Sequence, residues 1–137
     1  MAAPNEALLD EHLAAENAHD LDRIMATYGA AAPFMVLNGQ RLAGADAIRA
    51  FHRGFGFGSD GSFSEVQVTE RARHRTPEAI IIQQTLSGVH TGAWQQLPPT
   101  GKRFEVEVCT VYRFDDAGML ASEHVYFDLA LLARQLR

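Results

Sequence analysis

The sequence predicts a single α+β domain over residues 1–137, in which a curved antiparallel or mixed sheet wraps around N-terminal helices to form a cone. Three observations predict this class. Apolar residues in the first 55 positions recur at helical spacing, those in the second half alternate as in strands, and helices followed by a run of strands are typical of α+β folds. A sheet bent around helices leaves a hollow, so we expect an apolar pocket there.

Two helices open the chain. The first contains Leu9, Leu13 and Glu16 and is expected to end near residues 18–19. Asp20 is the expected N-cap of the second helix, because an aspartate side chain accepts a hydrogen bond from a free amide of the first helical turn. The apolar residues of this second helix follow at the i, i+3, i+4, i+7 spacing and are Leu21, Ile24, Met25 and Tyr28.

A short strand and a third helix come next. The strand covers residues 34–37 and is closed by the turn dipeptide at 38–39. Asp46 is the expected N-cap of the third helix. Residues 54–63 are rich in glycine with interleaved phenylalanines, which predicts either a mobile lid over the pocket or a connector that its phenylalanines hold in place. One face of the third helix carries Ile48, Phe51 and Phe55.

The second half of the chain reads as successive strands. Gly88 and Gly92 fall inside the longest of them and indicate a bulge or a sharp bend. The four strands and the final leucine-rich helix are expected over residues 65–75, 79–94, 103–114, 119–127 and 129–136.

Charge and composition exclude several function classes. The net charge of −5, from 12 basic and 17 acidic side chains, is opposite to that of a nucleic-acid-binding protein. We interpret the basic residues within 71–75 and 102–103 as solvated edges. Cys109 is the single cysteine and cannot form an internal disulfide. No apolar run is long enough for a membrane span, and the first twelve residues lack a signal peptide's features, so we expect a cytoplasmic protein without membrane partners.

Several local strings carry a family resemblance. Residues 16–22 (ENAHDLD) and 44–48 (GADAI) resemble the nuclear-transport-factor-2-like superfamily, which has a cystatin-like fold. Residues 88–94 (GVHTGAW) and 98–103 (PPTGKR), with the ending from Tyr126 onward (YFD), look like the SnoaL-like polyketide cyclase group within it. The resemblance covers nearly the whole chain.

The resemblance implies an acid–base enzyme that needs neither a metal nor an organic cofactor, and it implies a homodimer. Its cyclases close a ring by intramolecular aldol condensation with an aspartate as base, and Asp128 best matches that residue. Ketosteroid isomerases share the fold, but their base would fall near Met35 or Val36, their second acid near Thr110 and their tyrosine near His12. None of these matches, so steroid isomerisation by that mechanism is not expected.

Asp128 has two interpretations. A carboxylate in an apolar pocket has a raised pKa and can remove a proton next to a carbonyl. The same residue directly precedes the final helix, where aspartate is a favoured N-cap. Strand alternation groups Asp128 with His124 and Tyr126 on one face, and the sequence does not say whether that face is the inner one.

The further candidates are His90 as a second catalytic residue and several substrate-binding residues. His90 lies between Gly88 and Gly92 and could donate a hydrogen bond to a developing enolate, or it could be a satisfied core histidine. Trp94 could stack on a flat ligand or plug the end of the sheet. The remaining candidates for contact with the substrate are His12, Tyr28, Met35 and Tyr126.

Each of these also has a plainer interpretation. His12 and Glu16 share one helix face and could point into the pocket or into solvent. Tyr28 could simply be core, and we interpret His52 as a surface or rim residue. The histidines of the predicted strands, at 74, 90 and 124, have no tight spacing, so no metal site is expected.

Three functional hypotheses follow. The first is a cyclase or isomerase in which Asp128 removes a proton from a hydrophobic carbonyl compound while His90 steadies the enolate. The second is a dehydratase or hydrolase in which a His90–Asp128 pair handles water. The third is a protein that binds a hydrophobic ligand without catalysis.

Overall fold

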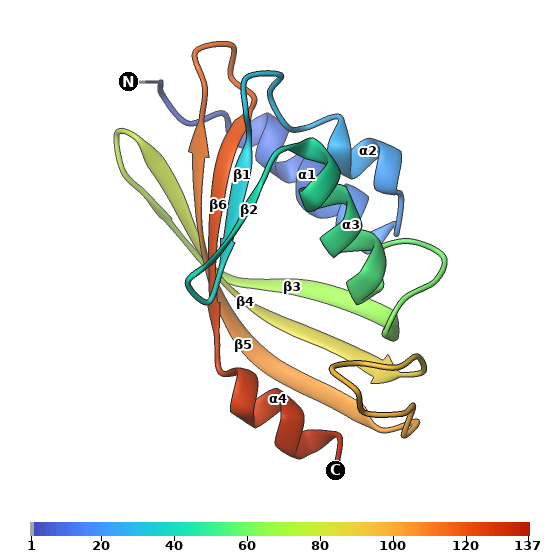
Figure 1. Ribbon diagram of the computed structural model, residues 1–137. Helices are drawn as coiled ribbons and strands as arrows, with labels where there is room; N and C mark the ends of the chain where they lie inside the picture. Colours follow the sequence, from blue (N-terminus) through green and yellow to red (C-terminus); the bar gives the residue numbers. More distant parts are fainter. Residues whose placement is uncertain (1) are drawn as a thin grey trace.

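The computed structural model describes residues 2–137 and contains four helices and six strands (Figure 1). The helices are α1 (Glu6–Asn17), α2 (Leu21–Met25), α3 (Ala45–Phe55) and α4 (Leu129–Gln135). The strands are β1 (Phe34–Leu37), β2 (Gln40–Ala43), β3 (Phe63–Arg75), β4 (Ala79–His90), β5 (Arg103–Phe114) and β6 (Leu120–Phe127).

All six strands form one sheet in the order β2-β1-β6-β5-β4-β3. Only the β1–β6 pair is parallel, so the sheet is mixed, as the sequence predicts. The strands are strongly bent, and α1, α2 and α3 lie against their concave side, while α4 lies beyond the end of β6 (Figure 1). The apolar core fills the space between these helices and the sheet, and this arrangement confirms the predicted α+β cone.

The bend in the sheet has a local cause in β3. Its pairing with β4 shifts register between Ser64 and Gln67, opposite Gly88. A β-bulge there strengthens the twist and bends the strand. Gly88 is required at this point, because a Cβ would lie 2.8 Å from the Phe104 ring. The predicted irregularity is therefore present, although it lies in the strand beside Gly88.

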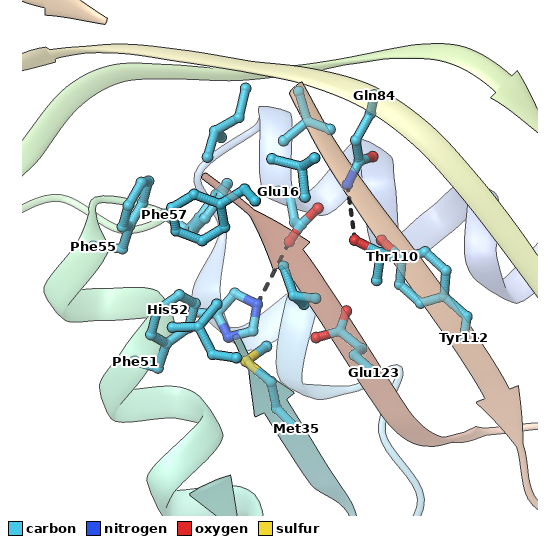
Figure 2. A pocket seen from close by; sticks show the side chains of 16 residues that line it. Glu16, Met35, Phe51, His52, Phe55, Phe57, Gln84, Thr110, Tyr112 and Glu123 are labelled. Carbon is cyan, nitrogen blue, oxygen red and sulfur yellow. Dashed lines mark hydrogen bonds and ion pairs between the residues drawn. The ribbon is translucent and has the colours of Figure 1, made fainter. Parts of the chain in front are cut away.

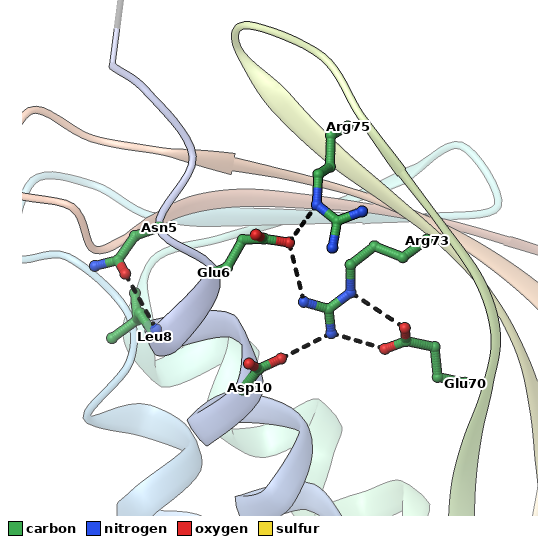
Figure 3. A network of polar contacts seen from close by, with 7 residues as sticks. All are labelled: Asn5, Glu6, Leu8, Asp10, Glu70, Arg73 and Arg75. Carbon is green, nitrogen blue, oxygen red and sulfur yellow. Dashed lines mark hydrogen bonds and ion pairs between the residues drawn. The ribbon is translucent and has the colours of Figure 1, made fainter.

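The first helix is fastened to β3 by an ion-pair network (Figure 3). The Arg73 guanidinium lies 2.8 Å from Asp10 and 3.4 Å from Glu6 of α1, and 2.7 Å from Glu70 of its own strand. Only 12% of the Arg73 side chain is exposed, so the interpretation of residues 71–75 as a solvated edge is wrong at this position. α1 carries two residues of the site described below, so this network helps to position that site.

Local signals for turns and caps are confirmed in two places. The Asp20 side chain accepts a hydrogen bond from the Arg23 amide and caps α2. Asn38 and Gly39 both have positive φ angles, of 47° and 89°, as required for the two-residue turn that joins β1 to β2.

Three other expectations are wrong. Gly44 rather than Asp46 is the N-cap of α3. β2 was not expected, because its residues are mostly exposed and lack an apolar pattern. The strand expected over 79–94 ends at His90, where Thr91 and Gly92 turn away to donate hydrogen bonds to the Ser62 carbonyl. Within residues 2–137, no helix combines the length and apolar character that crossing a membrane requires.

Candidate active site

A cavity lies between the helices and the concave face of the sheet (Figure 2). The empty space between its lining atoms is about 490 Å³ when the open mouth is included. Most of the lining is apolar and includes Met35, Phe51, Phe55 and Phe57. The connector between α3 and β3 thus contributes to the wall, and Phe55 packs 4.8 Å from Phe63 between ring centroids.

Strand alternation places polar groups on this wall. On β5 and β6 the pairs Tyr112–Glu123 and Thr110–Val125 stand opposite each other in the sheet, and all four residues face the cavity. The neighbouring residue Tyr126 points to the other face of the sheet. The inner face of β6 is therefore the one that carries Glu123, which answers a question that the sequence left open.

Four ionisable side chains converge at the closed end of the cavity. The Nε2 atom of His12 lies 2.9 Å from Glu123 Oε1 and 3.5 Å from Glu16 Oε2, and Nε2 of His52 lies 3.5 Å from the same Glu16 oxygen. All four are buried. Two imidazoles and two carboxylates can balance their charges, which reduces the cost of burying them away from water.

The Nδ1 atom of each ring makes a hydrogen bond that orients the ring. His52 Nδ1 lies 2.8 Å from the Ile48 carbonyl oxygen and must donate to it. The Thr27 hydroxyl donates to the Ile24 carbonyl at 2.6 Å, so it accepts from His12 Nδ1 at 2.9 Å. The Nε2 atom of each ring therefore faces the carboxylates.

The electrostatics of this cluster favour charged forms. Burial lowers the pKa of His12, but the charges of Glu16 and Glu123 outweigh burial and raise it to about 10. Burial raises the pKa of Glu16, but the charge of His12 and contacts with both histidines outweigh it, and the pKa lies well below its ordinary value. His12 is thus a cation and Glu16 an anion at neutral pH.

The carboxylate oxygens of Glu123 and Glu16 differ in the contacts that they make. Glu123 accepts a hydrogen bond from the Tyr28 hydroxyl at 2.7 Å in addition to its contact with His12, so both of its oxygens are occupied. Glu16 makes only the two 3.5 Å contacts with histidines within residues 2–137. Glu16 is therefore the carboxylate that is freer to act on a ligand.

The cavity continues into an outer compartment near Trp94. Leu37, Phe51, Phe55 and Phe127 line both spaces, and the outer one adds Trp94 together with the amide side chains of Asn38, Gln40 and Gln95. Trp94 is held by a turn in which its amide donates to the Leu97 carbonyl at 3.0 Å. Trp94 thus lies at the mouth of the cavity, where it could contact a ligand as expected.

Asp128 does not face the cavity, and the premise of its role as base is corrected here. Its side chain is exposed and accepts a hydrogen bond from the Leu131 amide at 2.9 Å, as the N-cap of α4. It is not among the residues that line the cavity. An exposed carboxylate outside the cavity cannot reach a ligand bound there, so the cap interpretation describes what it does.

His90 is likewise outside the cavity lining. It is buried, and its Nδ1 accepts a hydrogen bond from the Thr100 amide at 3.2 Å. This contact ties the end of β4 to the loop that carries Trp94. The structure does not bring His90 and Asp128 together at the cavity, so the pair expected to handle water has no geometric basis.

The other expected contact residues separate into two groups. Met35 lines the cavity, and His12 and Tyr28 are buried directly behind it, joined to Glu123. Tyr126 is 48% exposed and lies on the opposite face of the sheet, so its expected contact with a ligand in the cavity is wrong.

Sequence reasoning missed Glu123 and misplaced His52. Two signals could have found them. Glu123 alternates with Val125 and Phe127, which form the more apolar face of β6, and His52 follows Ile48 at helical spacing on the buried face of α3. His52 is therefore an interior residue and not a rim residue.

Potential metal ligands also occur in this cluster. Ligand atoms of His12, His52 and Glu123 lie within 4.8 Å of one another. Two imidazole nitrogens and a carboxylate could hold a divalent cation. Such a cation would have to displace the proton that His12 Nε2 holds against Glu123 at 2.9 Å.

Comparisons with known proteins identify the family. Among curated proteins, no sequence matches this chain. Among solved structures, a proposed polyketide cyclase from Xanthomonas campestris pv. campestris is similar, with a TM-score of 0.84, 18% identity and coverage of 96% of both chains. AclR, a proposed hydroxylase from Streptomyces galilaeus, is similar with a TM-score of 0.80, 21% identity, and coverage of 96% of this chain and 79% of the other.

A third similar structure is described by its fold. It is a hypothetical protein with a ketosteroid isomerase-like fold from Catenulispora acidiphila DSM 44928, with a TM-score of 0.76, 18% identity, and coverage of 93% of this chain and 90% of the other. At these identities the likeness shows the shared fold. The family model described as SnoaL-like polyketide cyclase matches residues 7–136, and the chain therefore belongs to that family.

Proposed function

We propose that this protein is a cofactor-free acid–base enzyme of the cyclase or isomerase type, which removes a proton next to a carbonyl group of a hydrophobic substrate. Membership in the SnoaL-like family favours a cyclase- or isomerase-type enzyme. The observation that carries the proposal is the pair formed by Glu16 and His52, 3.5 Å apart on the wall of an apolar cavity. We refer to this pair as the Glu16–His52 dyad.

The dyad takes up and returns the proton. Glu16 is ionised at neutral pH and accepts a proton from the substrate carbon as the C–H electron pair becomes the C=C bond of an enolate. Its lowered pKa makes it a weak base, so it acts by its position beside the substrate and passes the proton on. His52 Nε2, at 3.5 Å, exchanges that proton with Glu16, since its Nδ1 remains bonded to the Ile48 carbonyl.

The enolate can react in two ways, and all atoms are accounted for in both. In isomerisation, the dyad returns the proton to a different carbon of the same molecule. In ring closure, the enolate carbon attacks a second carbonyl carbon of the same molecule, a C–C bond forms, and the dyad gives its proton to the resulting alkoxide. Ring closure of a polyketide-like compound is the finer version that the family resemblance favours.

The surroundings support this chemistry. His12 and Glu123 form a buried ion pair behind the dyad, and the cation of His12 keeps Glu16 ionised. Tyr112 lines the cavity, and its pKa is raised well above 10, first by burial and then by the charge of Glu123. It remains a neutral phenol that can donate a hydrogen bond to the substrate carbonyl.

Deuterium exchange tests the proposal without knowledge of the natural substrate. 2-Tetralone is a neutral bicyclic ketone whose C1 protons lie between a carbonyl and an aromatic ring. Incubated in D₂O with the protein, it should exchange these protons faster than in buffer, and the catalysed rate should fall at least about 100-fold in Glu16→Gln and in His52→Gln. A catalysed rate that both variants retain would refute the assignment of the dyad.

A further inference from the structure

A polar group on the sheet side of the cavity has no hydrogen-bond partner among the residues that the structure describes. Gln84 is 6% exposed, and its Oε1 atom is buried without a hydrogen bond within residues 2–137. Its Nε2 donates to the Thr110 hydroxyl oxygen at 3.3 Å (Figure 2). A buried acceptor that lacks a hydrogen-bond donor lowers the stability of the folded protein. A functional role would explain why Gln84 occupies this position.

Gln84 stands in a row of inward-facing residues of β4 that is otherwise apolar. It interrupts the inward-facing row of β4, which otherwise consists of Ile80, Ile82 and Leu86 before Gly88. Its neighbours on the cavity wall include Val68 and Val108, which offer no hydrogen-bond donor. An apolar residue at position 84 would continue the row and remove the unsatisfied oxygen.

Gln84 and Thr110 together present a specific pattern to the cavity. Gln84 Oε1 is an acceptor, and Thr110, whose oxygen accepts from Gln84, still has its own hydroxyl proton to donate. An acceptor next to a donor matches a hydroxyl group, which donates one hydrogen bond and accepts another. An anion lacks the donor, and an ammonium group lacks the acceptor.

We propose that Gln84 and Thr110 bind a neutral hydroxyl group of the substrate, so that the enzyme acts on a hydroxylated carbonyl compound. The inference rests on the proposed function, because it concerns the same cavity. Gln84 and Thr110 approach from β4 and β5, whereas Glu16 and His52 approach from α1 and α3 (Figure 2). The hydroxyl group therefore binds at the sheet wall while the carbon that loses its proton faces the helices.

Binding of two matched probes tests this site separately from catalysis. 2-Tetralone and 6-hydroxy-2-tetralone differ by one hydroxyl group on the ring that does not carry the ketone. We expect the wild-type protein to bind the hydroxylated probe at least about tenfold more tightly, because a site built for a hydroxyl group discriminates against its absence. Calorimetry and the fluorescence of Trp94, the single tryptophan, would measure both affinities.

The matched variant is the double substitution Gln84→Met with Thr110→Val, which removes both polar partners and keeps a similar volume. It should bind the two probes equally and unfold at the same or a higher temperature, because the unsatisfied oxygen is gone. A structural role for Gln84 would instead lower the unfolding temperature, and this result would overturn the proposal. Equal affinities in the wild type, including no measurable binding of either probe, would also overturn it.

A second variant separates this inference from the proposed function. Glu16→Gln should lose proton exchange but keep its preference for the hydroxylated probe. If exchange survives in Glu16→Gln while the hydroxyl preference depends on Gln84, the proposed base is wrong and the hydroxyl site stands. If exchange is lost in Glu16→Gln and no preference exists in the wild type, the base stands and the hydroxyl site is wrong.

Discussion

His12 Nε2 lies 2.9 Å from Glu123 Oε1 in the interior of the protein, where neither side chain has appreciable contact with solvent. This ion pair joins the first helix to the last strand, which are more than a hundred residues apart in the sequence. Breaking a buried pair on one side leaves an uncompensated charge. The stability of the fold and the electrostatics of the cavity are therefore coupled at this point.

The first prediction concerns the pH dependence of stability. The folded-state pKa of His12 is raised from 6.5 to about 10, so its contribution is complete below pH 6.5 and is lost as pH rises towards 10. The free energy of unfolding, measured by urea denaturation, should fall over this interval by roughly a few kcal/mol. In His12→Gln the decline between pH 6.5 and 10 should largely disappear; an unchanged decline would contradict the assignment.

Glu123→Gln should lower the pKa of His12. The substitution keeps an acceptor for Tyr28 but removes one of the two charges that raise this pKa. We expect a loss of roughly 1–3 kcal/mol in the free energy of unfolding near pH 6. An NMR titration of the ¹⁵N-labelled imidazole of His12 in the wild type and in the variant would measure the pKa directly, and an unchanged pKa would contradict the role of Glu123.

Arg73→Met should destabilise the protein by roughly 1–2 kcal/mol, because three carboxylates lose their common partner on a largely buried side chain. Arg75→Met is the matched control. Arg75 is 60% exposed and, within the described residues 2–137, forms an ion pair with Glu6 alone, so its loss should cost about 0.5 kcal/mol or less. Equal effects in the two variants would show that the network does not fasten α1 to β3.

Asp128→Ala should lower the free energy of unfolding by about 1 kcal/mol, the usual contribution of an N-cap. Asp128→Ser retains a side-chain acceptor for the Leu131 amide and should restore most of this loss. Chemical denaturation of the two variants provides the comparison. A loss of stability that serine does not restore would mean that the side chain contributes in another way than as a cap.

The sequence carries enough information to predict the cone but not the site. Asp20 and the turn at 38–39 are read correctly because a cap or a tight turn depends on residues adjacent in the chain. Glu123 meets His12 only because β6 pairs with β1 and β5 and faces α1. That contact joins distant segments, and no local pattern encodes it.

Asp128 shows the reverse case. Its position before an apolar run predicts a cap from local chemistry, and the structure has that cap. Its role as base rests on the family resemblance alone. Sequence alternation does not show which face of the last strand points into the cavity. The homodimer implied by the resemblance and the cytoplasmic location inferred from the composition stay predictions.

The most direct test of the account compares two carboxylates that differ in where the fold places them. Glu16 lines the cavity beside His52, and Asp128 is an exposed cap. Catalysed deuterium exchange into 2-tetralone should fall at least about 100-fold in Glu16→Gln and stay within about twofold of wild type in Asp128→Asn. Loss of exchange in Asp128→Asn, with Glu16→Gln unaffected, would contradict the account.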